Sequence, residues 1–184
     1  MLYSMFSFVL DVVSGLLVGA CLLRAYMQWI RAPFGRPLGP FVMALTDWVV
    51  LPLRQLLALR SRLDVSSVVA ALLLELAQYA LLWVVAGMPM AGLAALPVLA
   101  GLGVVRVAIS GLIGLILVQA VLSWVQPGRN ALSDTLDRLC APLLAPVRRR
   151  MPLVGGVDLS PLVVLVILQV AAMLLGAVQI RLLY

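Results

Sequence analysis

Charged and amide side chains inside long apolar runs are the residues of this sequence most able to do chemistry. Arg24 and Glu75 each interrupt such a run, and Gln78 shares a helical face with Glu75. An ionised group at the centre of a membrane-spanning helix costs about 2.5–3.5 kcal/mol on insertion scales, which makes these residues functional candidates. Arg24 precedes Trp29 by about 8 Å of helix, at about 1.5 Å per residue, and Glu75 lies deeper.

The equivalent positions in the second half of the chain, which repeats the first as shown below, are Gln119 and Gln169. A charged pair thus becomes a pair of neutral amides. Residues in contact are expected to lose both charges together, because one buried charge alone is expensive. The sequence therefore predicts that Arg24 contacts Glu75 and that Gln119 contacts Gln169. Such a contact is either a polar site for an ion or a proton, or a structural bond between helices.

No constellation typical of an enzyme accompanies these residues. Histidine is absent, which removes the commonest metal ligand and general base. Cys21 lies in an apolar run and Cys140 in a basic loop, so both fit packing better than a disulfide or a metal site. We therefore expect no enzyme, no metal and no cofactor. The net charge is +6 but no nucleic-acid-binding motif is present, so we expect no nucleic acid among the partners.

The elements that must position these residues are membrane-spanning helices. Of the 184 residues, 65% are apolar and 11% are charged, and the mean hydropathy is +1.19. Four apolar runs reach the length of about 20 residues that crosses a bilayer as helix. They cover residues 4–30, 65–86, 103–125 and 161–183. The expected fold is an all-α membrane protein with four transmembrane helices. An uncharged, apolar stretch at 88–105 joins the second run to the third.

Both long loops are rich in arginine, whereas the termini and the linker nearly lack it. Residues 31–64 and 126–158 hold five arginines each. Because arginine-rich short loops remain in the cytoplasm, we expect a multi-pass protein of the bacterial inner membrane with both loops cytoplasmic and both termini outside. A fifth span at 88–105 would separate the two loops, which disfavours it. The lipid bilayer, with anionic headgroups at the cytoplasmic face, would be a partner.

The chain repeats itself at an offset of 94 or 95 residues. Each repeat contains a span, an interfacial tryptophan, a Pro-x-Arg segment, an Asp-x-Ser segment and a second span. The matched residues are Trp29 and Trp124, Pro52 and Pro146, Arg54 and Arg148, Asp64 and Asp158, and Ser66 and Ser160. Repeats with two spans each enter the membrane in the same sense, so they are parallel repeats. We assign residues 1–87 to the first repeat, 88–105 to the linker and 106–184 to the second repeat.

Several of these residues have a direct physical role. Ser160 followed by Pro161 is a strong helix-start signal. The arginine and aspartate of each repeat could pair where the chain turns back from the interface, or could be solvated loop charges. Each loop also contains an amphipathic stretch, which lies either on lipid or on the protein's own spans. In the second loop its apolar face consists of Leu132, Leu136, Leu139 and Leu143.

These motifs resemble the YggT family, also called YlmG in plastids. The second repeat carries them most completely, as Ser123-Trp124, as Pro142-Leu143-Leu144-Ala145-Pro146-Val147-Arg148, and as Gly155-Gly156-Val157-Asp158-Leu159-Ser160-Pro161. The first repeat departs from the pattern, with Gln28-Trp29, Asp47-Trp48 and Ser66-Ser67. Each repeat thus keeps only part of the family's Asp-Pro element, which argues against a catalytic aspartate.

The resemblance implies a link to osmotic tolerance and ion homeostasis, or to division and envelope organisation, without an established enzymatic activity. Some plastid relatives assist haem attachment, but a chain without histidine is not expected to hold haem itself. Two hypotheses follow. The first is a membrane scaffold or assembly factor that acts through its amphipathic segments on lipid or on a membrane protein partner. The second is a small cation channel or transport accessory, which with four spans would need to form a homo-oligomer.

The charge pattern yields a testable topology. Cysteines introduced at Arg36 and at Arg149, one in each arginine-rich loop, should both be labelled by impermeant thiol reagents only after the cytoplasmic side is opened. Labelling of either position from outside the intact membrane would contradict the assignment.

Overall fold

The computed structural model describes residues 2–31, 38–57, 64–87, 95–125, 131–150 and 158–183. Those residues form helices joined by short turns, with no strand among them. The helices are α1 (Leu2–Trp29), α2 (Leu38–Leu57), α3 (Val65–Val85), α4 (Leu96–Val125), α5 (Ala131–Arg148) and α6 (Ser160–Leu183). The predicted all-α class is therefore confirmed.

Four of these helices are long and apolar enough to cross a membrane. They are α1, α3, α4 and α6, with spans at Tyr3–Trp29, Val65–Val85, Leu96–Ser123 and Ser160–Arg181. The chain is thus a multi-pass membrane protein. The third span is longer than the sequence predicted, because α4 already begins at Leu96 and takes in the second half of the expected linker. Proline at position 97 is compatible with this start, since a helix's first turn needs no amide donor there.

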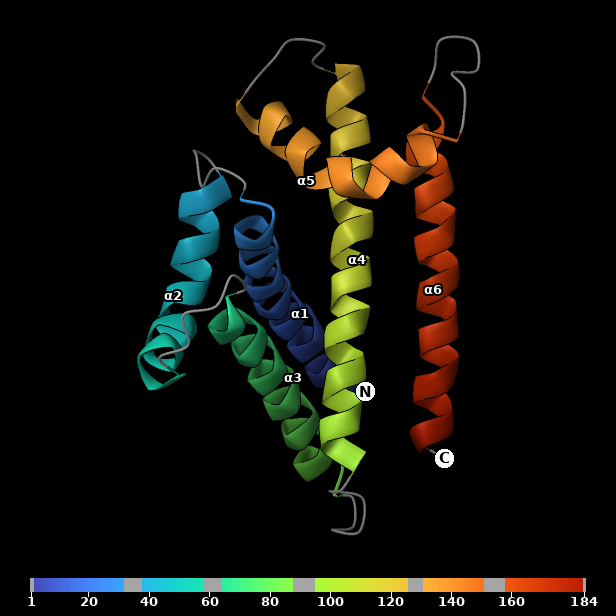
Figure 1. Ribbon diagram of the computed structural model, residues 1–184. Coiled ribbons are helices and arrows are strands. Elements are labelled where there is room, and N and C mark those ends of the chain that lie inside the picture. The colour runs from blue at the N-terminus through green and yellow to red at the C-terminus, as the bar shows by residue number, and fades with distance from the viewer. Residues whose placement is uncertain are drawn as a thin grey trace.

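The spans form two units that run in the same sense, α1–α2–α3 and α4–α5–α6 (Figure 1). Helices α1 and α4 run in one direction, and α3 and α6 return in the other. Both termini therefore lie at one end of the molecule, and α5 lies at the opposite end. This arrangement confirms the two parallel repeats. The domain boundaries at 87 and 105 stay a prediction.

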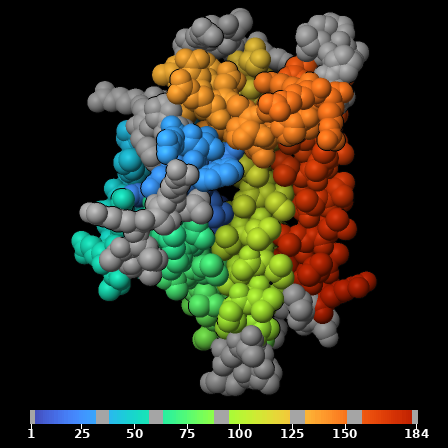
Figure 2. Space-filling view, viewed as in Figure 1, coloured from blue at the N-terminus to red at the C-terminus, as the bar shows by residue number. Residues whose placement is uncertain are grey.

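The two loop helices are placed differently. Helix α5 crosses α4, which continues past it, and reaches the start of α6, whereas α2 runs down beside α1 and α3 (Figure 1). Proline occurs inside both, at Pro52 in α2 and at Pro142 and Pro146 in α5. Figure 2 shows α5 spread over one end of the second unit. The two repeats thus share a sequence pattern, but their loop helices pack differently against the spans.

Helix α5 joins the two units through its apolar face. Leu136 and Leu139 are buried against Met27 at the end of α1, and Leu144 is buried with Ile116 of α4. The hydroxyl of Tyr26 also donates a hydrogen bond to the carbonyl of Leu139 at 2.8 Å. Of the two alternatives for this amphipathic helix, packing on the protein's own spans is therefore the one observed for the buried leucines.

Truncating this contact should weaken the whole assembly. Leu139 is fully buried, so Leu139→Ala should cost about 2–5 kcal/mol of unfolding free energy through lost packing and the cavity left behind. The matched control is Leu56→Ala in α2, whose side chain is 80% exposed. Thermal unfolding of both purified variants in detergent measures the difference. Equal stability of the two variants would contradict the role of α5 as a bridge.

Candidate intramembrane polar site

The buried guanidinium of Arg24 ties together three elements of the first unit. It donates to the Asp47 carboxylate at 2.6 Å and to the Thr46 hydroxyl at 2.8 Å, both on α2. Its Nε lies 3.5 Å from Oδ2 of Asp64, the residue that precedes α3. The Asp64 side chain is only 4% exposed and also accepts a hydrogen bond from Ser67 at 2.8 Å. Two carboxylates and a hydroxyl therefore satisfy the arginine where α1, α2 and α3 meet.

The second unit makes the same connections with separate bonds. Gln119, the counterpart of Arg24, donates to Asp137 of α5 at 2.8 Å. Arg148, at the end of α5, pairs with Asp158 at 2.6 Å, and Asp158 accepts hydrogen bonds from Ser160 at the start of α6. Burial would raise the pKa of Asp158, but the bonds from Ser160 and Arg148 outweigh it and hold the pKa below its usual value.

The predicted contacts among these residues are therefore wrong in two cases. Arg24 does not reach Glu75, because Asp47 and Asp64 lie nearer to the same end of the bundle. Gln119 bonds to Asp137 instead of Gln169, whose side chain is exposed on α6. Of the two Arg–Asp pairs with equal spacing, Arg148 and Asp158 do pair, whereas Asp64 is taken by Arg24 in place of Arg54.

Glu75 belongs to a different polar cluster, in the middle of the spans. The residue is 4% exposed and, within the described part of the chain, its carboxylate has neither a hydrogen bond nor an ion pair. One oxygen lies against the backbone of α4, since a Cβ added to Gly103 would stand 2.6 Å from Glu75 Oε2. Only glycine leaves room for this approach. The carboxylate is therefore held at the contact between α3 and α4.

A cavity of about 440 Å³ opens beside Glu75, between α1, α3 and α4. Its polar lining consists of Asp11, Glu75, Gln78, Tyr79, Arg106 and Ser110. Gln78 donates a hydrogen bond to Asp11, which links α3 to α1 across the cavity. Arg106 is on α4, ten residues after its start at Leu96, about 15 Å into the helix. With both carboxylates ionised, the three charged groups would sum to one negative charge.

The remaining residues predicted from the sequence lie outside the Arg24 network and the polar cavity. Trp29, Pro52, Arg54 and Pro146 are exposed, Pro161 is half-buried, and Ser66 and Ser160 are buried at the starts of α3 and α6. Leu132 and Leu143 are half-buried on α5. The side chain of Trp124 lies outside the described residues. Burial raises the pKa of Cys140 to about 11, with a further contribution from Asp137, so this thiol is not a reactive one.

Comparison with known proteins identifies the group to which this arrangement belongs. The sequence profile of the CCB3/YggT family matches residues 3–85 and again 98–179, once for each structural unit. The chain belongs to the CCB3/YggT family. YggT of Escherichia coli K12 is 34% identical over 91% of this chain and 87% of its own length. A Vibrio alginolyticus protein is 32% identical over 92% of both chains, and a Haemophilus influenzae protein is 30% identical over 80% and 78%.

Neither the family description nor the names of these relatives assign a catalytic activity. No solved structure matches the chain. Among the residues described for this CCB3/YggT protein, no three histidine, cysteine, aspartate or glutamate side chains are grouped as metal ligands would be. The site must therefore be judged from its own chemistry.

Sequence reasoning missed four members of the two polar clusters of this CCB3/YggT chain. Thr46 and Asp47 lie in the first arginine-rich loop, and nothing in their spacing marks them as partners of Arg24. Asp11 and Arg106 each lie toward one end of an apolar run. The signal that could have found Asp11 and Arg106 is that each is an ionisable residue within an apolar run, as Glu75 is.

The difference in burial between the two Arg–Asp pairs gives a matched prediction for the CCB3/YggT chain. Arg24→Gln should cost about 3–5 kcal/mol of unfolding free energy, because it leaves the buried Asp64 without its cation. Arg148→Gln should cost at most about 1 kcal/mol, because that pair is partly exposed. Denaturation in detergent compares them directly. A tolerated Arg24→Gln would show that the buried network does not hold the unit together.

Proposed function

We propose that this protein binds a proton or a monovalent cation at Glu75 inside the membrane and serves cation transport, as a transport accessory or as part of an oligomeric channel. The observation that carries the proposal is the buried carboxylate of Glu75, which lies beside a polar cavity without a hydrogen bond or ion pair to any described residue. An ionised carboxylate buried without hydrogen bonds is costly, so a positive ligand that neutralises it would be strongly favoured.

The composition of the cavity limits the ligand. Its polar groups apart from Arg106 offer oxygen atoms of carboxylate, amide, phenol and hydroxyl groups, and such ligands suit hard cations. The positive charge of Arg106 offsets one of the two carboxylates, Asp11 and Glu75. A single positive charge would bring the cluster to neutrality, which favours a proton or a monovalent ion over a divalent one.

Transport would require more than one chain. Four spans supply few pore-lining groups, so we infer a homo-oligomer or a membrane protein partner in the bacterial inner membrane. The arginine-rich connections on the side of α5 would face the cytoplasm and its anionic headgroups. This proposal extends the family resemblance to ion homeostasis and osmotic stress, and assigns its chemistry to one site.

A scaffold or assembly role is the second candidate. Its support is the outer face of α2, where Phe41, Trp48 and Leu56 are 61%, 63% and 80% exposed. An exposed row of large apolar side chains is suited to lipid or to a partner helix. Helix α5 offers less support for this role, since three of its leucines are buried within the protein itself.

The cation proposal is tested by ligand-dependent stability. The melting temperature of the purified wild-type protein should rise with Na⁺ or K⁺ at constant ionic strength, or with falling pH at constant salt, because a ligand that binds only the folded state stabilises it. Glu75→Gln should abolish that response. The control is Asp134→Asn, which removes one carboxylate from the exposed face of α5 and should leave the response intact.

The two arms distinguish the ligands. A response to the metal ions identifies a cation site, and a response to pH alone identifies a proton site. If Glu75→Gln responds as the wild type does in both arms, Glu75 is not the site, and the scaffold role through α2 becomes the better explanation.

A further inference from the structure

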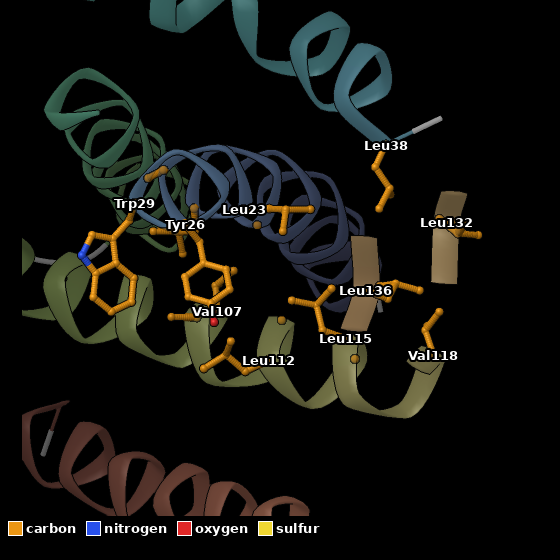
Figure 3. A pocket seen from close by; sticks show the side chains of 16 residues that line it. Leu23, Tyr26, Trp29, Leu38, Val107, Leu112, Leu115, Val118, Leu132 and Leu136 are labelled. Atoms are coloured by element: carbon orange, nitrogen blue, oxygen red, sulfur yellow. The ribbon is translucent and has the colours of Figure 1, made fainter. Parts of the chain in front are cut away.

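A second cavity lies between the two units, and its character is the opposite of the first. It has a volume of about 700 Å³ and runs along the α1–α4 seam toward α5 (Figure 3). Leu23, Tyr26 and Trp29 of α1 face Leu115 and Val118 of α4 across it. Leu132 and Leu136 of α5 and Leu38 of α2 complete the wall.

The wall offers a ligand almost nothing to hydrogen-bond. Nearly every lining side chain is aliphatic or glycine, and the hydroxyl of Tyr26 already donates to the Leu139 carbonyl at 2.8 Å. A polar ligand would lose its water without compensation there. The occupant must therefore be hydrocarbon. A cavity of about 150 Å³ is enough for benzene, so this one has room for a long chain.

We propose that the α1–α4 seam binds one acyl chain of an anionic phospholipid from the surrounding bilayer. The seam belongs to two membrane-spanning helices, where acyl chains are the available hydrocarbon. A helix of a second copy, about 10–12 Å across, fits less well because Met27, Leu136 and Leu139 pack together beside α5 and narrow the seam there. A single acyl chain is thinner and flexible enough to pass them and reach the level of the headgroups.

Aromatic and basic residues mark the end of the seam at which the lipid headgroup would lie. Trp29 is 57% exposed at the rim of the cavity, as expected for a side chain at headgroup level. Arg31 follows two positions later, is exposed, and forms no ion pair with the described residues. A free cation at this position complements a phosphate and the net negative charge of an anionic lipid.

The two cavities touch. Gly19, Val107 and Gly111 line both of them, so a chain in the seam would end beside the polar cavity of Glu75. The lipid site does not depend on the cation proposal, because its own evidence is the shape and chemistry of the seam.

The test uses the full chain in nanodiscs containing a phosphatidylglycerol with a photoactivatable acyl chain. Cross-links should concentrate in residues 19–29 and 107–118. Gly114→Leu fills the seam, since an added Cβ at Gly114 meets nothing within 4 Å. If the new leucine side chain displaces two methylene groups of the acyl chain, cross-linking in the seam should fall about tenfold. Gly176→Leu in α6 makes the same change in open space outside the seam and should have no effect.

A separate experiment tests whether the bound lipid carries an anionic headgroup. Competition by unlabelled phosphatidylglycerol should exceed competition by phosphatidylcholine, and Arg31→Gln should reduce that preference. Cross-links spread evenly over α1, α4 and α6, or unchanged in Gly114→Leu, would overturn the acyl-chain site. Cross-linked pairs of chains through the seam would replace the lipid with a second copy.

Discussion

The arrangement of the first unit follows from one requirement, which is that the charge of Arg24 must be satisfied within an apolar helix. Asp47 and Thr46 meet it from α2, and Asp64 meets it from the start of α3. These bonds fix how far α3 lies along α1 and which of its faces turns toward α4. Glu75 then rests against Gly103, and Gln78 reaches Asp11. The arginine network and the polar cavity thus lie along the same packing of α1 and α3.

The second unit shows how the same plan works without a buried arginine. Its polar bonds, from Gln119 to Asp137 and from Arg148 to Asp158, join residues that are closer together in the sequence and more exposed to solvent. Helix α5 can therefore lie across α4 and the start of α6, while α2 lies beside α1 and α3. The repeats have diverged in geometry because their polar residues have diverged in charge and depth.

The four spans, the parallel repeats and the amphipathic α5 could be predicted because they depend on apolar length and local periodicity. The partner of Arg24 could not, since Asp47, Asp64 and Glu75 are all acids within its half of the chain and helix rotation decides among them. The comparison between repeats predicted the wrong partner for Gln119. This side chain bonds to Asp137, and the first repeat has no aspartate at the equivalent position. The glycines at 101 and 103 indicate a close approach between helices, but only the packing of α3 on α4 decides that Glu75 is the residue that approaches Gly103.

The order of residues in the Arg24 network also bears on biosynthesis. Translation delivers α1 first, yet the acids that neutralise its arginine come 23 and 40 residues later, at Asp47 and Asp64. Until then the nascent helix holds an uncompensated charge, which an arginine relieves by extending toward the membrane surface. The first helix can therefore reach its final packing only after Asp64 has been synthesised, so the first repeat completes its packing as one unit.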